Sequence, residues 1–376
     1  MSTAVDNPDI AIFIRALEGG GAQRDAILLA NALAPRVRGV NILTLQDQGR
    51  LRALVAENVA VTAVGADKLR SAVPALRRTL ARIRPRVLLS SEAAANVAAF
   101  LAARSLPVAI RPRILLREVT SPTIAAATDP YLQNRLAYKV LRPVFSRADR
   151  VLTLTAGARR DLIQDFHVPA ERIAVMRANA VLDPATEARL AEAARQPGPR
   201  EPGLVVSVGR LSPEKDQLVL VEAMARLDAG RPTRLVLIGD GPLRPEIEQR
   251  ISTLGLADRV TLAGHQNDPF AWLLQAELAV CSSRFDGFGN ALVEAMACGT
   301  PVVSTDCPWG PREILEDGRW GALVPVGDAA ALAVAIDRQL STEPDRAGLR
   351  TRASAFTAAA AADAFLEIVN ALPTAP

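Results

Sequence analysis

The sequence predicts an α/β protein built from two doubly wound domains, each a parallel sheet covered by helices on both faces. Three observations predict this fold class. Short β-branched or leucine-rich runs alternate with longer helical patterns along most of the chain. At 376 residues, the chain is longer than a single hydrophobic core usually supports. The alternation stops once, over residues 182–203, where a polar, alanine-rich stretch ends in a Pro/Gly cluster.

Seven apolar runs before this interruption are typical of buried parallel strands, and helical patterns such as AILLANALA fill the gaps between them. The expected strands cover residues 10–14, 40–45, 59–64, 87–91, 114–117, 151–155 and 173–176. We therefore expect an N-terminal Rossmann-like domain over residues 1–181, followed by a linker over residues 182–203.

The same alternation restarts at residue 204, with expected strands at 204–208, 234–238, 259–263, 278–282 and 301–304. This pattern predicts a C-terminal domain over residues 204–353. The alanine-rich helix over about 354–372 is either the last helix of this domain or a strap that packs back on the first. Because doubly wound sheets bind ligands at the carboxyl ends of their strands, we expect a cleft between the two facing domains to hold the site.

Composition argues against several kinds of site. The three cysteines, Cys281, Cys298 and Cys307, show no CxxC spacing, which indicates neither a disulfide framework nor a zinc site. With only two histidines in the chain, we expect no metal. No apolar run approaches the roughly 18 residues of a spanning helix. The N-terminus lacks the basic and apolar regions of a signal peptide, so we expect a cytoplasmic protein.

The charge is distributed unevenly along the chain. The first 180 residues carry 26 Lys or Arg against 14 Asp or Glu, whereas the remainder carries 18 against 26. A basic excess favours nucleic acid or an anionic membrane surface as partner. Because only 4% of residues are aromatic, base stacking is disfavoured. We therefore expect a membrane partner and no nucleic acid.

One basic segment, residues 69–86, is a candidate for membrane docking. Apolar residues recur there at helical spacing, and the segment contains no acid. One interpretation is an ordinary domain helix with a solvated basic face. The other is docking on anionic lipid through the arginines of this helix, with Arg70, Arg77, Arg78 and Arg82 as the candidate contacts.

A glycine loop, EGGGAQR, follows the first expected strand and leads into a helix. Gly19 and Gly21 fit a dinucleotide fingerprint, but its third position is Arg24, so a dinucleotide cofactor is not expected. The remaining alternatives are a plain tight turn and a helix start whose amides approach an anion closely. Gly20, Gly21 and Arg24 are the candidate ligand-binding residues of this loop.

The loop VGRLSPEKD follows the first strand of the second domain and carries Arg210 and Lys215. Cations at the carboxyl end of such a strand lie where a phosphate binds. Solvated surface charge is the alternative interpretation. Only 3 of the 44 basic residues are lysine, so a lysine retained here indicates a need for a compact ammonium group.

Two carboxylates stand eight positions apart in RFDGFGNALVEAMACGTPVV, residues 284–303. Asp286 lies in a glycine-rich loop, and Glu294 lies one turn inside the helix that follows, for which Asn290 is the expected N-cap. Amides at this helix start favour an anion, whereas the two acids repel a bare one. A ligand that carries both phosphate and hydroxyl groups satisfies both. The candidate residues for binding this ligand are Gly287, Phe288, Gly289, Asn290 and Glu294.

Several motifs, in this order along the chain, resemble those of the family 4 retaining glycosyltransferases of GT-B fold. They are GGGAQR, GRLSPEKD, LVLIGDGPLRPEIEQRI, LAGHQNDPFAWL, SSRFDGFGNALVEAMACGTPVV and GPREIL. The resemblance implies that Glu294 binds ribose hydroxyls of a nucleotide, and that Asp286 lies near the donor sugar. It also implies that His265 lies near the pocket for the base.

Two positions differ from the family pattern. The first acid of the E-x7-E signature is Asp286 here, one methylene shorter than glutamate. Many members carry a donor-contacting histidine in a loop of the first domain, where this chain has Glu118 followed by Val119. Glu118 is therefore a candidate on the acceptor or donor side. His167 is expected to be a surface residue.

The resemblance implies transfer of a hexose-type sugar from a nucleotide-sugar substrate, with UDP as nucleotide, to a lipid-linked, glycolipid or polysaccharide acceptor. Arg210, Lys215 and Asp286 are the expected catalytic residues, and no cofactor or metal is expected. The protein is expected to lie on the inner face of the cytoplasmic membrane. The alternatives are a nucleotide-sugar epimerase or hydrolase of the same fold, and a non-catalytic protein that binds sugar nucleotide or membrane.

Overall fold

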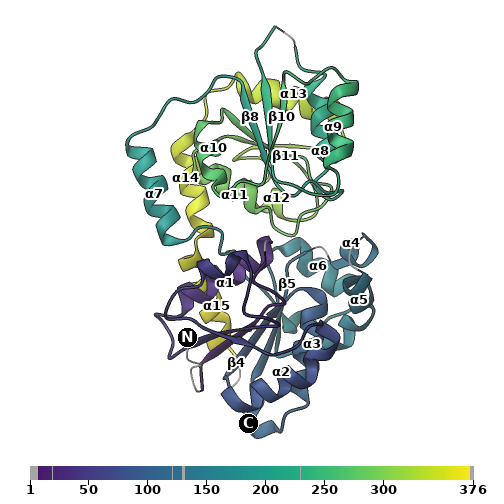
Figure 1. The fold of residues 1–376 in the computed structure, drawn as a ribbon, viewed down its shortest axis with the longest axis vertical. Helices are drawn as coiled ribbons and strands as arrows, with labels where there is room; N and C mark the ends of the chain where they lie inside the picture. The colour runs from purple at the N-terminus through teal and green to yellow at the C-terminus, as the bar shows by residue number, and fades with distance from the viewer. Residues whose placement is uncertain (1–6, 19, 121, 129–131, 229, 373–376) are drawn as a thin grey trace. The chain divides into compact units, whose positions relative to one another are not determined.

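The computed structural model describes residues 7–18, 20–120, 122–128, 132–228 and 230–372. The chain forms two compact units (Figure 1). Unit 1 contains the residues up to Asp183 together with those from Phe356 onward, and unit 2 runs from Pro184 to Ala355.

Unit 1 is built on a seven-stranded parallel sheet with the order β3-β2-β1-β4-β5-β6-β7. Each expected strand is present, and its ends differ from the expected ones by at most two residues. The strands are β1 (Ile10–Phe13), β2 (Val40–Thr44), β3 (Ala60–Ala63), β4 (Val87–Ser91), β5 (Arg113–Glu118), β6 (Arg150–Thr153) and β7 (Ile173–Val175). They are buried because helices cover both faces of the sheet.

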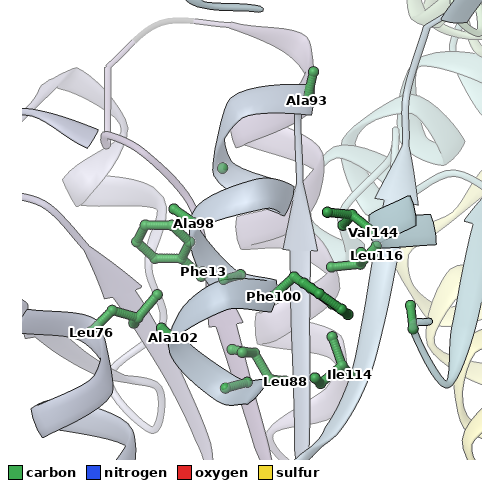
Figure 2. Close-up of a cluster of buried hydrophobic side chains, with 14 of the residues drawn as sticks. Phe13, Leu76, Leu88, Ala93, Ala98, Phe100, Ala102, Ile114, Leu116 and Val144 are labelled. Carbon is green, nitrogen blue, oxygen red and sulfur yellow. The ribbon is translucent and has the colours of Figure 1, made fainter. Parts of the chain in front are cut away.

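The helices of unit 1 connect these strands. They are α1 (Gly21–Leu33), α2 (Leu69–Ile83), α3 (Ala93–Arg104), α4 (Pro122–Thr128), α5 (Leu132–Phe145), α6 (Ala156–Gln164) and α15 (Ala358–Asn370), with short 3-10 turns at Arg50–Leu54, Val108–Ile110 and Ala170–Arg172. Neighbouring helices α2, α3 and α5 cover one face of the sheet (Figure 1). Figure 2 shows Phe100 of α3 among Ile114, Leu116 and Val144 in the core beneath them.

Unit 2 is built on a six-stranded parallel sheet with the order β10-β9-β8-β11-β12-β13. Its strands are β8 (Leu204–Val208), β9 (Arg234–Ile238), β10 (Val260–Gly264), β11 (Leu278–Cys281), β12 (Val302–Thr305) and β13 (Ala322–Val324). Its helices are α7 (Pro184–Arg195), α8 (Gln217–Met224), α9 (Arg244–Thr253), α10 (Pro269–Gln275), α11 (Asn290–Ala297), α12 (Gly310–Ile314), α13 (Ala329–Leu340) and α14 (Arg346–Ala353), followed by the turn Ser354–Phe356. The three-residue edge strand β13 was not among the expected strands.

The interpretation of residues 182–203 as a linker is wrong for residues 184–195, which form helix α7 of unit 2. Proline at the first helical position and several alanines favour a helix there. Arg189 of α7 donates to both carboxylate oxygens of Asp268, at 2.7 and 2.9 Å, and its guanidinium lies 5.3 Å from the centre of the Phe270 ring. These contacts attach α7 to helix α10.

Of the two placements considered for the C-terminal helix, the structure has the return to unit 1. Leu182 pairs with Thr357 in a parallel bridge, and the amide of Ala358 donates to the carbonyl of Leu182 at 2.7 Å. Helix α15 packs on α1, where Ala361, Ala362 and Phe365 are fully buried. The cleft expected between the two sheets stays a prediction.

Candidate active site

The strand order of unit 2 defines where a ligand is expected. The order reverses between β8 and β11, which are neighbours in the sheet although β9 and β10 lie between them in sequence. Such a reversal leaves a crevice at the carboxyl ends of the two strands, where doubly wound proteins bind ligands. Arg210 and Lys215 follow β8, and Asp286 and Glu294 follow β11. Three of the four candidates therefore lie in the two loops at this point, and Glu294 lies in helix α11, which the second loop leads into.

Lys215 and Asp286 are brought together from the two loops. The Lys215 ammonium forms an ion pair with the Asp286 carboxylate, and the two side chains are 27% and 23% exposed. Burial alone lowers the pKa of Lys215, but the charge and hydrogen bond of Asp286 outweigh it and raise this pKa above its ordinary value. Lys215 is therefore a fixed positive charge that solvent still reaches.

The loop after β8 is held by hydrogen bonds to its backbone carbonyl and amide groups. The Ser282 hydroxyl donates to the carbonyl of Lys215 at 2.9 Å, and the Gln217 amide donates to the carbonyl of Arg210 at 2.8 Å. The amide of Leu211 bonds to the carbonyl of Asp240 at 3.1 Å. Arg210 itself is exposed, so its guanidinium can reach a ligand at this edge.

The loop that carries Asp286 is clamped by the segment after β12. The amide of Asp286 donates to the carbonyl of Pro308 at 3.0 Å, and the amide of Trp309 donates to the carbonyl of Asp286 at 3.1 Å. A Cβ at Gly310 would lie 1.4 Å from the carbonyl oxygen of Phe288, so no larger residue fits there. Phe288 is buried, and Gly287 before it is partly buried. The clamp fixes the backbone from which the Asp286 side chain extends.

Helix α11 begins one residue earlier than its sequence suggests. Asn290 was the expected N-cap, but the cap is Gly289, whose φ of 112° places it in the region that favours glycine, and Asn290 is the first helical residue. The predicted cap is wrong because the tight loop needs a positive φ at the residue before the helix, and glycine adopts such a φ readily. Glu294 lies in the next turn and is partly buried.

His265 is exposed directly after β10, two strands away from β8 in the sheet. Its position at the carboxyl edge agrees with a place near a bound base, and its role stays a prediction. His167 is exposed in the connection between α6 and β7, as expected.

Unit 1 repeats the reversal of strand order, here between β1 and β4. Gly20 is the N-cap of α1 and Gly21 its first residue, whereas Gly19 lies outside the described residues. A Cβ at Gly20 would lie 2.1 Å from the Gln23 side-chain oxygen. The Gln23 side-chain amide donates to the Glu92 carboxylate at 2.5 Å, which joins the first turn of α1 to the N-cap of α3.

Arg24 contacts the last residues of the first segment of unit 1. Its guanidinium donates to the carbonyl of Val181 at 3.0 Å and lies 3.9 Å from the Asp183 carboxylate. A ligand-binding role for Arg24 stays a prediction. Its neighbour Asp25 was not singled out from the sequence. Asp25 forms an ion pair with Arg117 of β5, and both side chains are buried.

Glu118 ends β5 and is almost fully buried. One of its carboxylate oxygens accepts from the Thr120 amide at 3.1 Å, from the Thr120 hydroxyl at 2.7 Å and from the Tyr138 hydroxyl at 3.2 Å. Burial raises the pKa of Glu118 to about 7, although these hydrogen bonds oppose the shift. The other oxygen has no hydrogen-bond partner. Glu118 therefore changes protonation near neutral pH.

The pKa of each free cysteine favours the thiol over the nucleophilic thiolate. Burial raises the pKa of Cys281, Cys298 and Cys307 to about 12, so each stays a thiol. Among the described residues, no group of three His, Cys, Asp or Glu side chains could hold a metal ion.

The candidate docking arginines lie on α2, which ends at Ile83 because Arg84 turns into the left-handed region with φ 44°. Arg77, Arg78 and Arg82 are exposed, and the Arg70 side chain lies outside the described part. Leu76, Leu80 and Ile83 of the same helix are buried. Within the described part of the chain, no helix has both the length and the apolar character needed to cross a bilayer.

Two family models match the chain. The model "Glycosyl transferase 4-like domain" matches residues 20–179, and "Glycosyl transferases group 1" matches residues 202–342. The gap between the two matches lies where the first segment of unit 1 ends, at Asp183, and the sheet of unit 2 begins, at Leu204.

Curated relatives align with part of the chain. Alpha-D-kanosaminyltransferase of Streptomyces kanamyceticus is 32% identical over 260 residues, which are 68% of this chain and 66% of the relative. N-acetylgalactosamine-N,N'-diacetylbacillosaminyl-diphospho-undecaprenol 4-alpha-N-acetylgalactosaminyltransferase of Campylobacter jejuni is 29% identical over 64% of this chain and 65% of its own length. The chain thus spans slightly less than two thirds of these relatives.

Solved structures match nearly the whole chain. Anabaena HepE in complex with UDP and glucose has a TM-score of 0.77 and 20% identity, covering 97% of this chain and 100% of that protein. Sucrose-phosphate synthase from Thermosynechococcus elongatus has a TM-score of 0.77 and 21% identity, covering 96% and 98%. At these identities the comparison shows the fold, which is GT-B.

Proposed function

The chain belongs to the glycosyltransferase family that these two models describe, and we propose that it is a retaining enzyme that transfers a hexose-type sugar from a nucleoside diphosphate donor to a lipid-linked or glycan acceptor. One observation carries the proposal. Two cations and two carboxylates, Arg210, Lys215, Asp286 and Glu294, follow the two strands at which the sheet order of unit 2 reverses.

The four residues have three tasks in this proposal. Arg210 and Lys215 hold the donor diphosphate and neutralise the charge that grows on it as the bond to the sugar breaks. Glu294 accepts hydrogen bonds from the ribose diol. Asp286 holds the Lys215 ammonium in place through their ion pair before the donor binds. Because two fixed cations supply the positive charge, we expect no metal to be required.

The proposed reaction keeps the configuration of the sugar. An acceptor hydroxyl attacks the anomeric carbon on the face that the departing diphosphate vacates, so the new glycosidic bond replaces the sugar–phosphate bond on the same face. A phosphate oxygen of the leaving group takes the proton of the acceptor hydroxyl.

Donor and acceptor classes are supported by relatives. HepE, which shares the fold, is crystallised with UDP and with UDP-glucose, so UDP is the favoured nucleotide. The name of the Campylobacter relative contains diphospho-undecaprenol, and LpsE of Rhizobium meliloti is a lipopolysaccharide core biosynthesis glycosyltransferase. We therefore favour a lipid-linked acceptor and a peripheral location on the inner face of the cytoplasmic membrane.

The test is donor binding followed by turnover. A thermal-shift screen of nucleotide sugars identifies the donor, because a bound ligand raises apparent stability. Turnover is then measured with lipid-linked and glycan acceptors, and the anomeric configuration of the product is read by NMR. Steady donor cleavage without acceptor would favour a hydrolase or epimerase. Donor binding without turnover on any acceptor would favour a non-catalytic binding protein.

The variant Lys215→Ala tests the proposed contact between the Lys215 ammonium group and the departing diphosphate. We expect kcat/KM to fall by the equivalent of roughly 2 to 4 kcal/mol in the transition state. Lys68→Ala is the matched control, because Lys68 is an exposed lysine of unit 1. Equal activity of the two variants would remove Lys215 from the mechanism.

A further inference from the structure

The helix layer of α2, α3 and α5 in unit 1 presents an outward surface of one charge sign. Contacts join α2 to α3 and α3 to α5, so the three helices form a continuous layer (Figure 1). Together they contain eight Arg or Lys residues and no Asp or Glu. Such a surface repels other cations and attracts an anionic partner.

Helix α5 adds apolar side chains to this charge. One stripe along its outer side, at i, i+4 and i+7, consists of Leu136, Val140 and Pro143. Leu136 is 50% exposed and Val140 is 46% exposed. The adjacent stripe has the same spacing and consists of the exposed cations Arg135, Lys139 and Arg142. We call these six residues the α5 face.

The apolar stripe is not required by the core. The inner side of α5 is already apolar and buried through Ala137, Leu141, Val144 and Phe145. A helix that is apolar on two sides is usually covered on both. Leu136 and Val140 therefore resemble contact residues rather than parts of the hydrophobic core.

The two other helices of the layer, α3 and α2, differ in the exposed side chains that they add beside the α5 face. In the last turn of α3, Leu101 is 48% exposed and Arg104 is exposed, and Val108, in the 3-10 turn that follows, is 67% exposed. On α2 the residues exposed beside the arginines are not large hydrophobics, since Leu76 and Leu80 are buried. Charge alone is thus available on α2, whereas α3 and α5 supply charge together with apolar surface.

We propose that the α5 face, continued by the end of α3, docks unit 1 on an anionic lipid bilayer, with Leu136 and Val140 immersed at the level of the headgroups. Interleaved cations and aliphatic side chains fit such a surface, because the cations pair with lipid phosphates while the aliphatic groups leave water. Lys139 and Arg142 can keep their charged ends at the headgroups while their stems are buried. The purpose of docking rests on the proposed function, in which the acceptor is lipid-linked.

Other occupants fit less well. A second copy that docked through the same face would bring two acid-free cationic surfaces together. A nucleic acid would use the cations, but it gives exposed leucine and valine no partner comparable to a lipid chain. Both occupants remain distinguishable outcomes of the test.

The experiment measures partitioning of the full chain onto vesicles of phosphatidylcholine with phosphatidylglycerol. Lys139→Gln with Arg142→Gln is expected to weaken partitioning roughly 30-fold at low salt, since each cation near an anionic surface contributes about fivefold. Leu136→Gln with Val140→Gln is expected to weaken it roughly tenfold at low and at high salt, because burial of apolar surface is not screened.

Controls separate docking from folding and from general surface chemistry. Val334→Gln with Arg338→Gln removes one exposed valine and one exposed arginine from α13 of unit 2, and it should leave partitioning unchanged. Lys139→Arg with Arg142→Lys keeps the charge and should keep wild-type partitioning. Thermal unfolding of every variant checks that unit 1 is still folded.

Three results would overturn the proposal. They are wild-type partitioning by both α5 variants, equal partitioning of the wild type on neutral vesicles, and self-association or RNA binding that the α5 variants abolish while vesicle binding stays. UDP-sugar affinity, measured without vesicles, should be the same in wild type and α5 variants. If no nucleotide sugar binds but partitioning still follows the α5 face, the proposed function fails and the docking surface stands.

Discussion

Glu118→Gln offers a quantitative check on the buried carboxyl group of unit 1. The pKa of this group is raised from 4.5 to about 7 in the folded chain, whereas the unfolded chain titrates near 4.5. The folded state therefore binds more protons than the unfolded state between these two values. Stability from this group is complete below about pH 4.5 and is lost as the pH rises through 7.

The size of the effect follows from the shift. At about 1.36 kcal/mol for each pKa unit, ionisation of Glu118 costs roughly 3 kcal/mol of unfolding free energy above pH 7. Glutamine resembles the protonated carboxyl group, and its carbonyl oxygen can still accept from Thr120 and Tyr138. The variant is therefore expected to match the wild type near pH 4.5 and to be about 3 kcal/mol more stable at pH 8.

The assay is urea unfolding of both proteins between pH 4.5 and 8.5, with the difference in unfolding free energy plotted against pH. Glu171→Gln removes an exposed carboxylate from the same unit and serves as control, with an expected difference within about 0.5 kcal/mol. A flat difference curve for Glu118→Gln would refute the reasoning. It would mean that burial does not disfavour the charged form of this carboxyl group.

Three further changes test the site and its support. Glu294→Gln should weaken UDP binding by roughly 1.5 kcal/mol in calorimetry, and unchanged affinity would argue against the ribose contact. Gly310→Ala should destabilise the chain by about 3 kcal/mol in urea unfolding, because its Cβ has no room, whereas Gly198→Ala, with open space around it, should be near neutral. Asp25→Ala leaves Arg117 buried and unpaired, so we expect a loss of roughly 3 to 5 kcal/mol in unfolding free energy; a loss below about 1 kcal/mol would mean that water reaches the guanidinium.

The strands were predictable because a parallel sheet covered on both faces needs uninterrupted apolar runs, which are visible in the sequence. The edge strand β13 was missed since three residues are too few to show a pattern. Helix α7 was missed because its polar composition and the following Pro/Gly cluster resemble a linker, although its alanines favour a helix.

The sequence indicated candidate members of the site, which stay a prediction, and it did not indicate how their side chains pair. Lys215 was indicated by the rarity of lysine, and Asp286 and Glu294 by their spacing. The ion pair between Lys215 and Asp286 depends on β8 lying next to β11, which no local pattern specifies. Arg117 gave a usable signal, because an arginine inside the buried run ILLRE must find a partner for its charge.

The return of α15 to unit 1 determines how the protein can be divided for experiments. Unit 2 is a single uninterrupted stretch, so a gene fragment covering residues 184–355 is expected to yield a folded product. A fragment that stops at residue 181 lacks the helix that buries Phe365 against α1, and it is expected to aggregate through the surface left uncovered. Expression of the first half therefore needs the last helix supplied as well, either fused through a short tether or added as a synthetic peptide.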